Sequence, residues 1–179
     1  MEIKRKKLTN EEIFSFEQKF AKEVSDVCEN RNPDFRAIGY ELDLEFGQKE
    51  NEAQSRFSIL SKEETKKYES GYVSRALITV KRQKTEAEKE EDLRLQQENL
   101  ALIESSESDQ EAEQLENDET LRRGEDENKR SVAFTRVMLV RAYKSFWTEW
   151  ISIGDNLEQL EADLQEFLEV LTQKKEENM

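Results

Sequence analysis

Residues 104–127 form an acidic block that limits what the middle of this chain can fold into. The block holds eleven carboxylates against Arg122 and Arg123, and its only large aliphatic side chains are Leu115 and Leu121. Two leucines bury too little apolar surface to offset the entropy of ordering a segment whose net charge is -9. The sequence therefore predicts an acidic linker or a frayed helical extension here.

The acidic block divides the chain into three regions. We expect an N-terminal α+β region at 1–103, the linker or helical extension at 104–127, and a C-terminal amphipathic helical hairpin at 128–179. Only 35% of the 179 residues are hydrophobic and the formal net charge is -14, so the core has to be small. The expected fold class is mostly α, as an α-rich α+β protein.

The N-terminal region begins with a helix signal. Thr9 and Glu12 have the spacing of a capping box, and apolar residues recur at helical spacing after them. The pattern predicts a helix over 10–29. Pro33 is expected to keep the helix from continuing, because the residue before a proline is disfavoured in the α conformation.

Alternating residues then indicate a strand. Apolar and acidic side chains alternate over 40–46 and end at Gly47, which predicts a strand with one apolar face. Residues 56–60 are a candidate partner for a small β-hairpin.

Ser61 and Glu64 form a second capping-box signal, and a long charged helix is expected from there to about residue 103. Within it, 71–80 is rich in β-branched residues and suits either a helix or a strand.

The C-terminal region has two amphipathic segments. Ser131 is a possible helix cap, and 131–150 has no helix breaker, so a helix is expected there. Asp155 and Glu158 form a third capping-box signal ahead of a leucine-rich stripe of the coiled-coil type. Because such a stripe must be covered, we interpret these segments as the partner-binding surface. Its candidate residues are Trp147, Trp150, Leu157, Leu160, Leu164, Phe167, Leu168 and Leu171.

Composition argues against an enzyme. The chain has no histidine, and Cys28 is its only cysteine. Cys28 lies beside Asp26 and Glu29, so its thiol pKa is expected to be raised and the thiol unreactive. No catalytic residue, metal site, cofactor or small-molecule substrate is expected.

A row of carboxylates is a candidate metal site, which would be an exception to this expectation. Glu41, Asp43 and Glu45 share one face of the predicted strand, but a solvent-facing strand surface explains them better than a metal site. The predicted location is cytoplasmic, because one cysteine forms no internal disulfide and no secretory signal or membrane span is evident.

The favoured function is a non-enzymatic protein–protein interaction module, such as an adaptor, assembly chaperone or structural component, docking through amphipathic helices. The expected partner is another protein or a second copy of the chain. A first alternative is an acidic inhibitor that mimics nucleic acid, for which the flexibility suggested by Ser105, Ser106, Ser108 and Gly124 is unfavourable.

A second alternative is a nucleic-acid binder using basic segments with aromatic residues. The net charge of -14 repels phosphate, so the basic residues are expected to neutralise acidic segments within the chain instead. Binding to nucleic acid is therefore considered unlikely, and no membrane interaction is expected. The basic residues are Lys66, Lys67, Arg75, Lys81, Arg82 and Lys84 in one group, and Arg130, Arg136, Arg141 and Lys144 in the other.

Overall fold

The computed structural model describes residues 2–5, 9–48, 53–54, 73–144 and 149–179, and it has an α-rich α+β fold. The fold class predicted from the sequence is confirmed. The described helices are α1 (Asn10–Ala37), α2 (Glu86–Glu104), α3 (Asp109–Arg130) and α4 (Leu157–Glu177). The described strands are β1 (Glu2–Arg5), β2 (Tyr40–Gln48), β3 (Ala53–Gln54), β4 (Val73–Arg82), β5 (Ser131–Lys144) and β6 (Glu149–Asp155).

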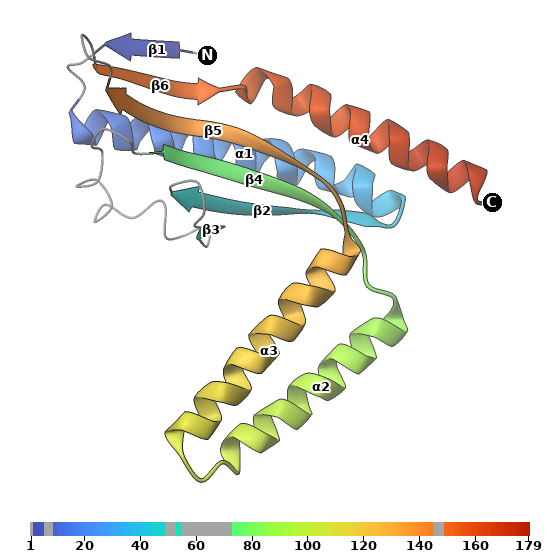
Figure 1. Cartoon of the computed structure of the whole chain (residues 1–179). Coiled ribbons are helices and arrows are strands. Elements are labelled where there is room, and N and C mark those ends of the chain that lie inside the picture. Colours follow the sequence, from blue (N-terminus) through green and yellow to red (C-terminus); the bar gives the residue numbers. More distant parts are fainter. Residues whose placement is uncertain (1, 6–8, 49–52, 55–72, 145–148) are drawn as a thin grey trace. The chain divides into compact units, whose positions relative to one another are not determined.

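The strands form one sheet in the order β1-β6-β5-β4-β2-β3 (Figure 1). β6 pairs antiparallel with β1 on one side and with β5 on the other. β2 pairs antiparallel with β3, so that Phe46 lies opposite Gln54. The predicted partner of β2 at 56–60 lies outside the described residues.

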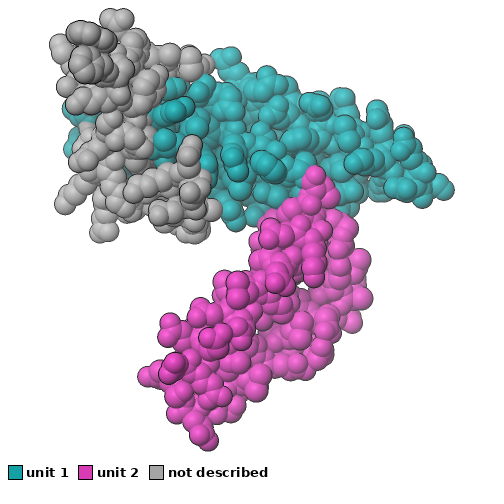
Figure 2. All heavy atoms as spheres, in the orientation of Figure 1, with its two compact units in different colours: residues 1–80, 133–179 teal, residues 81–132 magenta. Residues whose placement is uncertain are grey.

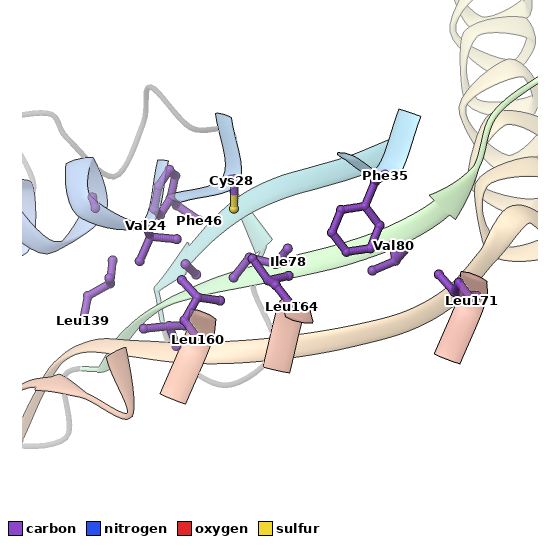
Figure 3. Packing of buried hydrophobic residues seen from close by; sticks show 13 residues of the cluster. Val24, Cys28, Phe35, Phe46, Ile78, Val80, Leu139, Leu160, Leu164 and Leu171 are labelled. Carbon is purple, nitrogen blue, oxygen red and sulfur yellow. The ribbon is translucent and has the colours of Figure 1, made fainter. Parts of the chain in front are cut away.

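The core lies between one face of the sheet and the helices α1 and α4. Alternate residues of β4 are buried, as expected for a strand with one covered face. Figure 3 shows how side chains from α1, the strands and α4 gather in one cluster. Its members include Val24 and Phe35 of α1, Ile78 and Val80 of β4, Leu139 of β5, and Leu160 and Leu164 of α4.

The chain divides into two compact units (Figure 2). Unit 1 comprises 1–80 and 133–179, and unit 2 comprises 81–132 with α2 and α3. This division differs from the predicted boundaries at 103 and 128. It differs because unit 1 is assembled from both ends of the sequence, whereas charge patterning follows only the order of residues along the chain.

The capping box of α1 is present as predicted. The Thr9 hydroxyl accepts a hydrogen bond from the Glu12 amide, and the Glu12 carboxylate accepts one from the Thr9 amide. The predicted end of the helix was wrong, because α1 continues through Pro33 to Ala37. Phe35 is fully buried in the core, and burial of a phenylalanine contributes about 1.5–3 kcal/mol, which compensates for much of the cost of about 3 kcal/mol of a proline inside a helix.

The acidic block is mostly helical, which agrees with the predicted helical extension and not with the predicted linker. Most of 104–127 lies in α3, which runs alongside α2 in unit 2. Ion pairs at the C-terminal end of the block favour the helix: Glu119 binds both Arg122 and Arg123 about one turn away, and Arg122 also binds Asp92 of α2. Such pairs stabilise helices that bury little apolar surface.

The predicted long helix is divided. Its segment 61–72 lies outside the described residues, 73–82 is strand β4, and 86–104 is helix α2. For 73–80, the described part of 71–80, the open alternative is thus resolved in favour of a strand, in keeping with its β-branched residues.

The helix predicted for 131–150 was wrong, since β5 and β6 occupy this region and residues 145–148 lie outside the described part. Consequently 128–179 is not a helical hairpin. Val137 and Leu139 are buried together on one side of β5, a spacing of two that marks a strand. Ser131 does cap a helix, but it is the C-terminal end of α3, where its hydroxyl donates to the Glu127 carbonyl.

α4 begins differently from the prediction. Its N-cap is Asn156 in the left-handed conformation, with φ of 52°, and not Asp155 in a capping box. The Asn156 side chain instead binds β5: its Oδ1 accepts from the Met138 amide at 3.1 Å and its Nδ2 donates to the Arg136 carbonyl at 2.7 Å. No helix among the described residues is both long and apolar enough to cross a membrane.

Candidate protein-binding surface

The leucine stripe of α4, predicted to bind a partner, is part of the core of unit 1. Leu160, Leu164 and Leu171 are only 1%, 0% and 6% exposed. Leu157, Phe167 and Leu168 are partly buried against the same cluster. Because α1 and the sheet cover these side chains, the stripe is already satisfied within the chain. Leu160, Leu164 and Leu171 are therefore core residues of unit 1 with little surface open to a partner.

The two tryptophans of the predicted surface lie at the edge of the described structure. Trp147 is outside the described residues. The backbone of Trp150 pairs with Arg5 of β1 and Tyr143 of β5, and its side chain is not described. The structure thus brings Trp150 into the sheet and not onto a helical face.

Cys28 is buried in the core. Burial raises the pKa of its thiol to about 12, and the Glu29 carboxylate contributes in the same direction. The raised pKa agrees with the sequence prediction, although burial is a larger cause than the neighbouring acid. A thiol of this kind stays protonated at neutral pH and lacks the thiolate that nucleophilic chemistry needs.

The acidic strand face does not form a recognisable cation site. Glu41, Asp43 and Glu45 all lie in β2. Within the described ranges, no cluster of three or more carboxylate, cysteine or histidine side chains has an arrangement that could hold a metal ion.

The α2–α3 hairpin has the least internal apolar packing of the described helices. A turn at 105–108 joins the two helices, and capping interactions define both of their N-termini. Thr85 and Glu88 form a complete capping box at the start of α2, and the Ser108 hydroxyl accepts from the Glu111 amide at the start of α3. No residue of α2 is buried, and Arg130 is the one buried residue of α3.

Ion pairs join the two helices at the base of the hairpin, where the chain enters and leaves it. Asp92 of α2 is bound by Arg122 of α3 at 2.9 Å and by Lys84 at 3.1 Å, and Lys84 also lies 3.5 Å from Asp126. Hydrogen bonding to Arg122 is the largest reason why the pKa of Asp92 lies below its usual value. The base is therefore held by charges that neutralise one another.

Other basic residues are engaged in the same way. Arg82 binds Glu88 at 2.7 Å, and this hydrogen bond is the main cause that lowers the Glu88 pKa to about 2. Lys81 pairs with Glu127 at 3.3 Å. These contacts support the expectation that basic segments neutralise acidic ones inside the chain.

We expect Arg122 to couple α2 to α3. Replacing it by glutamine removes its bonds to Asp92, and amide hydrogen exchange in α2 should become roughly 2- to 5-fold faster, the range for a partly exposed ion pair. Arg123→Gln is the matched control, because it removes the same charge but only an ion pair within α3. Equal exchange rates in α2 for the two variants would contradict this role.

The distal half of the hairpin carries unbalanced negative charge. Residues 95–121 contain nine carboxylates and no lysine or arginine. Seven of them make no ion pair with any residue in the part of the chain that the structure describes, unlike Asp92 and Asp126 at the base. They are Glu104, Glu107, Asp109, Glu111, Glu113, Glu116 and Asp118. Their charges remain available to a partner.

Leucines stand out among these charges. Leu93, Leu100 and Leu102 of α2 are 55%, 58% and 55% exposed, and Leu121 of α3 is 67% exposed. Leu93 and Leu100 are seven residues apart, or about two helical turns, so they share one side of α2. Sequence reasoning overlooked these residues, although leucines at a spacing of seven in an otherwise charged helix were a visible signal.

A shallow groove of about 280 Å³ runs between the helices in this distal half. Leu100 and Ile103 supply its apolar lining, and Gln96, Asn99 and Thr120 supply polar groups. Glu116 lies at its α3 side, together with Glu119 and Arg123, which form an ion pair with each other. The groove and its neighbouring leucines form an apolar surface within an acidic surround, which suits contact with another macromolecule.

Comparison with known proteins gives no relative from which a role can be transferred: no family model matches the chain, and no match was found among curated proteins or solved structures.

Proposed function

We propose that this chain is a non-enzymatic protein-interaction module that docks on its partner through the α2–α3 hairpin. The observation that carries the proposal is the set of leucines that are more than half exposed on helices with no buried apolar side chain. Leaving several leucines in water is unfavourable by roughly 1.5–3 kcal/mol for each side chain relative to burial. Because these leucines are 55–67% exposed, a partner that covers them gains roughly half of that free energy for each side chain. The docking helices are therefore α2 and α3, and α4 serves the core.

Co-purification from the native source tests this function. The full chain is compared with a Leu93→Ser, Leu100→Ser double variant, and circular dichroism first verifies equal helix content. Val170→Ser is the control, because Val170 is also an exposed apolar residue, at 44%, but lies on α4. We expect proteins that accompany the wild type and the control to be depleted at least about 10-fold from the double variant. Identical recovery with all three chains would exclude the hairpin as the docking surface.

A nucleic-acid mimic is the second candidate. The sequence argued against it on the ground of flexibility, and the helical order of the acidic block removes that objection. A mimic binds through charge, so its complex should weaken steeply with salt and tolerate the leucine substitutions. Docking through the leucines predicts that the leucine substitutions weaken the complex strongly, and that salt weakens it less steeply than it weakens a complex held by charge alone.

A further inference from the structure

We propose that the partner presents a cationic amphipathic helix, and that this helix lies on the groove side of the distal hairpin. The inference rests on the proposed docking function and specifies the chemistry of the partner. Apolar residues of the partner helix would contact Leu93, Leu100 and Ile103. Its lysines or arginines would face the carboxylates that have no ion pair within the described chain.

The spacing of the apolar groups favours a helix as the occupant. Leu93 and Ile103 are ten residues apart, so they span about 15 Å along α2 at 1.5 Å per residue. A partner helix of three turns covers that distance and repeats its apolar residues at three, four and seven positions. The seven-residue spacing of Leu93 and Leu100 matches that repeat. A third helix lying beside a helical pair also buries apolar faces that two helices alone leave exposed.

The negative charge of unit 2 favours a partner surface of positive charge. Unit 2, residues 81–132, has 17 acidic and 9 basic residues, and no base lies between Arg94 and Arg122. Carboxylates of one sign crowded on two neighbouring helices repel one another, and a cationic helix relieves this repulsion when it binds. A second copy of this hairpin, a nucleic acid and an anionic membrane all carry the wrong sign.

Two carboxylates are placed to contact such a helix. Glu116 lies at the groove, and Glu104 follows Leu100 by four residues and so lies on the same side of α2. Neither forms an ion pair with a described residue. The leucines would contact the apolar face of the partner helix, and the two carboxylates would contact its basic residues.

The test uses the full chain and three synthetic 14-residue peptides, followed by fluorescence anisotropy. The first peptide has leucines on one helical face and lysines on the other. The second replaces each lysine by glutamine, and the third has the composition of the first in an order that destroys the apolar face. We expect the first peptide to bind at least about 10-fold more tightly than either of the others, and to weaken as salt is raised.

Variants of the chain locate the contact. Glu104→Gln with Glu116→Gln should weaken binding of the first peptide about 3- to 10-fold, as expected for two partly exposed ion pairs. Glu176→Gln with Glu177→Gln changes the net charge equally but lies at the end of α4, and it should change binding less than 2-fold. Leu93→Ser with Leu100→Ser should weaken binding at least about 30-fold.

The outcomes separate this inference from the proposed function. Equal binding of the glutamine peptide would overturn the cationic requirement and leave apolar docking in place. Equal binding of the scrambled peptide would overturn the helix requirement. Absence of binding by the first peptide up to about 1 mM, which corresponds to about -4 kcal/mol, would overturn the inference altogether. The co-purification experiment would still decide the docking function by itself.

Discussion

Leu164→Ala is expected to lower the free energy of unfolding by about 2–5 kcal/mol, the range for a fully buried leucine truncated to alanine. Leu164 is 0% exposed and belongs to the cluster that joins α4 to α1 and the sheet. The change removes buried apolar surface and leaves a cavity that close-packed neighbours fill only in part. Urea unfolding, followed by circular dichroism, measures the loss.

Val170→Ala is the matched control for Leu164→Ala, because it also shortens an apolar side chain of α4 but at a position that is 44% exposed. Its expected effect is less than about 1 kcal/mol. If both variants unfolded at the same urea concentration, the α4 stripe would not be a core element. Its original interpretation as a partner-binding surface would then regain support.

Gly154→Ala should destabilise unit 1 by about 2–5 kcal/mol, because two separate costs add. Gly154 has a φ of +59°, a left-handed conformation that costs a residue with a Cβ about 1–2 kcal/mol. A Cβ at this position would also lie 2.9 Å from two ring carbons of Phe20 on α1. Relief of that overlap requires the ring or the strand to move, at a further cost of about 1–3 kcal/mol.

Gly39→Ala separates the two costs. Gly39 has a φ of +90°, and a Cβ there would meet nothing within 4 Å. This variant should therefore lose only the backbone contribution of about 1–2 kcal/mol. Thermal or urea unfolding of both variants gives the difference. Equal losses at the two positions would show that the approach of Phe20 to Gly154 does not matter for stability.

Short-range signals in the sequence were the most reliable guide to the fold. The Thr9 capping box, the alternation over 40–46 and the leucine stripe of α4 each identified an element that the structure contains. The Thr85 capping box was equally visible, and it would have separated α2 from the preceding strand. Such signals work because the interactions that produce them lie within one or two turns of the same element.

Predictions that depended on distant contacts were less successful. The helix predicted over 10–29 was too short, because the burial of Phe35 against the sheet compensates for much of the local cost of Pro33. Residues 131–144 combine helix-compatible spacing with β-branched side chains, and only the neighbouring strands decide between the two. Partner binding was assigned to α4 because the sequence does not reveal that α1 and the sheet already cover it.

The candidate surface was hidden for a related reason. Leu93, Leu100 and Leu102 lie in the segment predicted as a long charged helix, and only Leu121 lies in the acidic block. The sequence does not show that these side chains stay exposed, because their exposure depends on how the helix packs against the rest of the chain. Ion pairs such as Arg122 with Asp92 order the acidic block, and they join residues 30 positions apart. The spacing of charges within one helix gives no indication of such pairs between two helices.

The two ends of the hairpin lie close together. Arg130, at the end of α3, donates from its Nη1 to the carbonyl of Arg82 at 2.8 Å, and β4 and β5 are adjacent strands of the sheet. Residues 83–129 therefore take the place of the loop that connects the adjacent strands β4 and β5. A loop with closely spaced ends tolerates lengthening, shortening or replacement without changing the strands that carry it. In the proposed docking role, recognition is thus modular: a different helical pair grafted between β4 and β5 is expected to give the same sheet a new binding specificity.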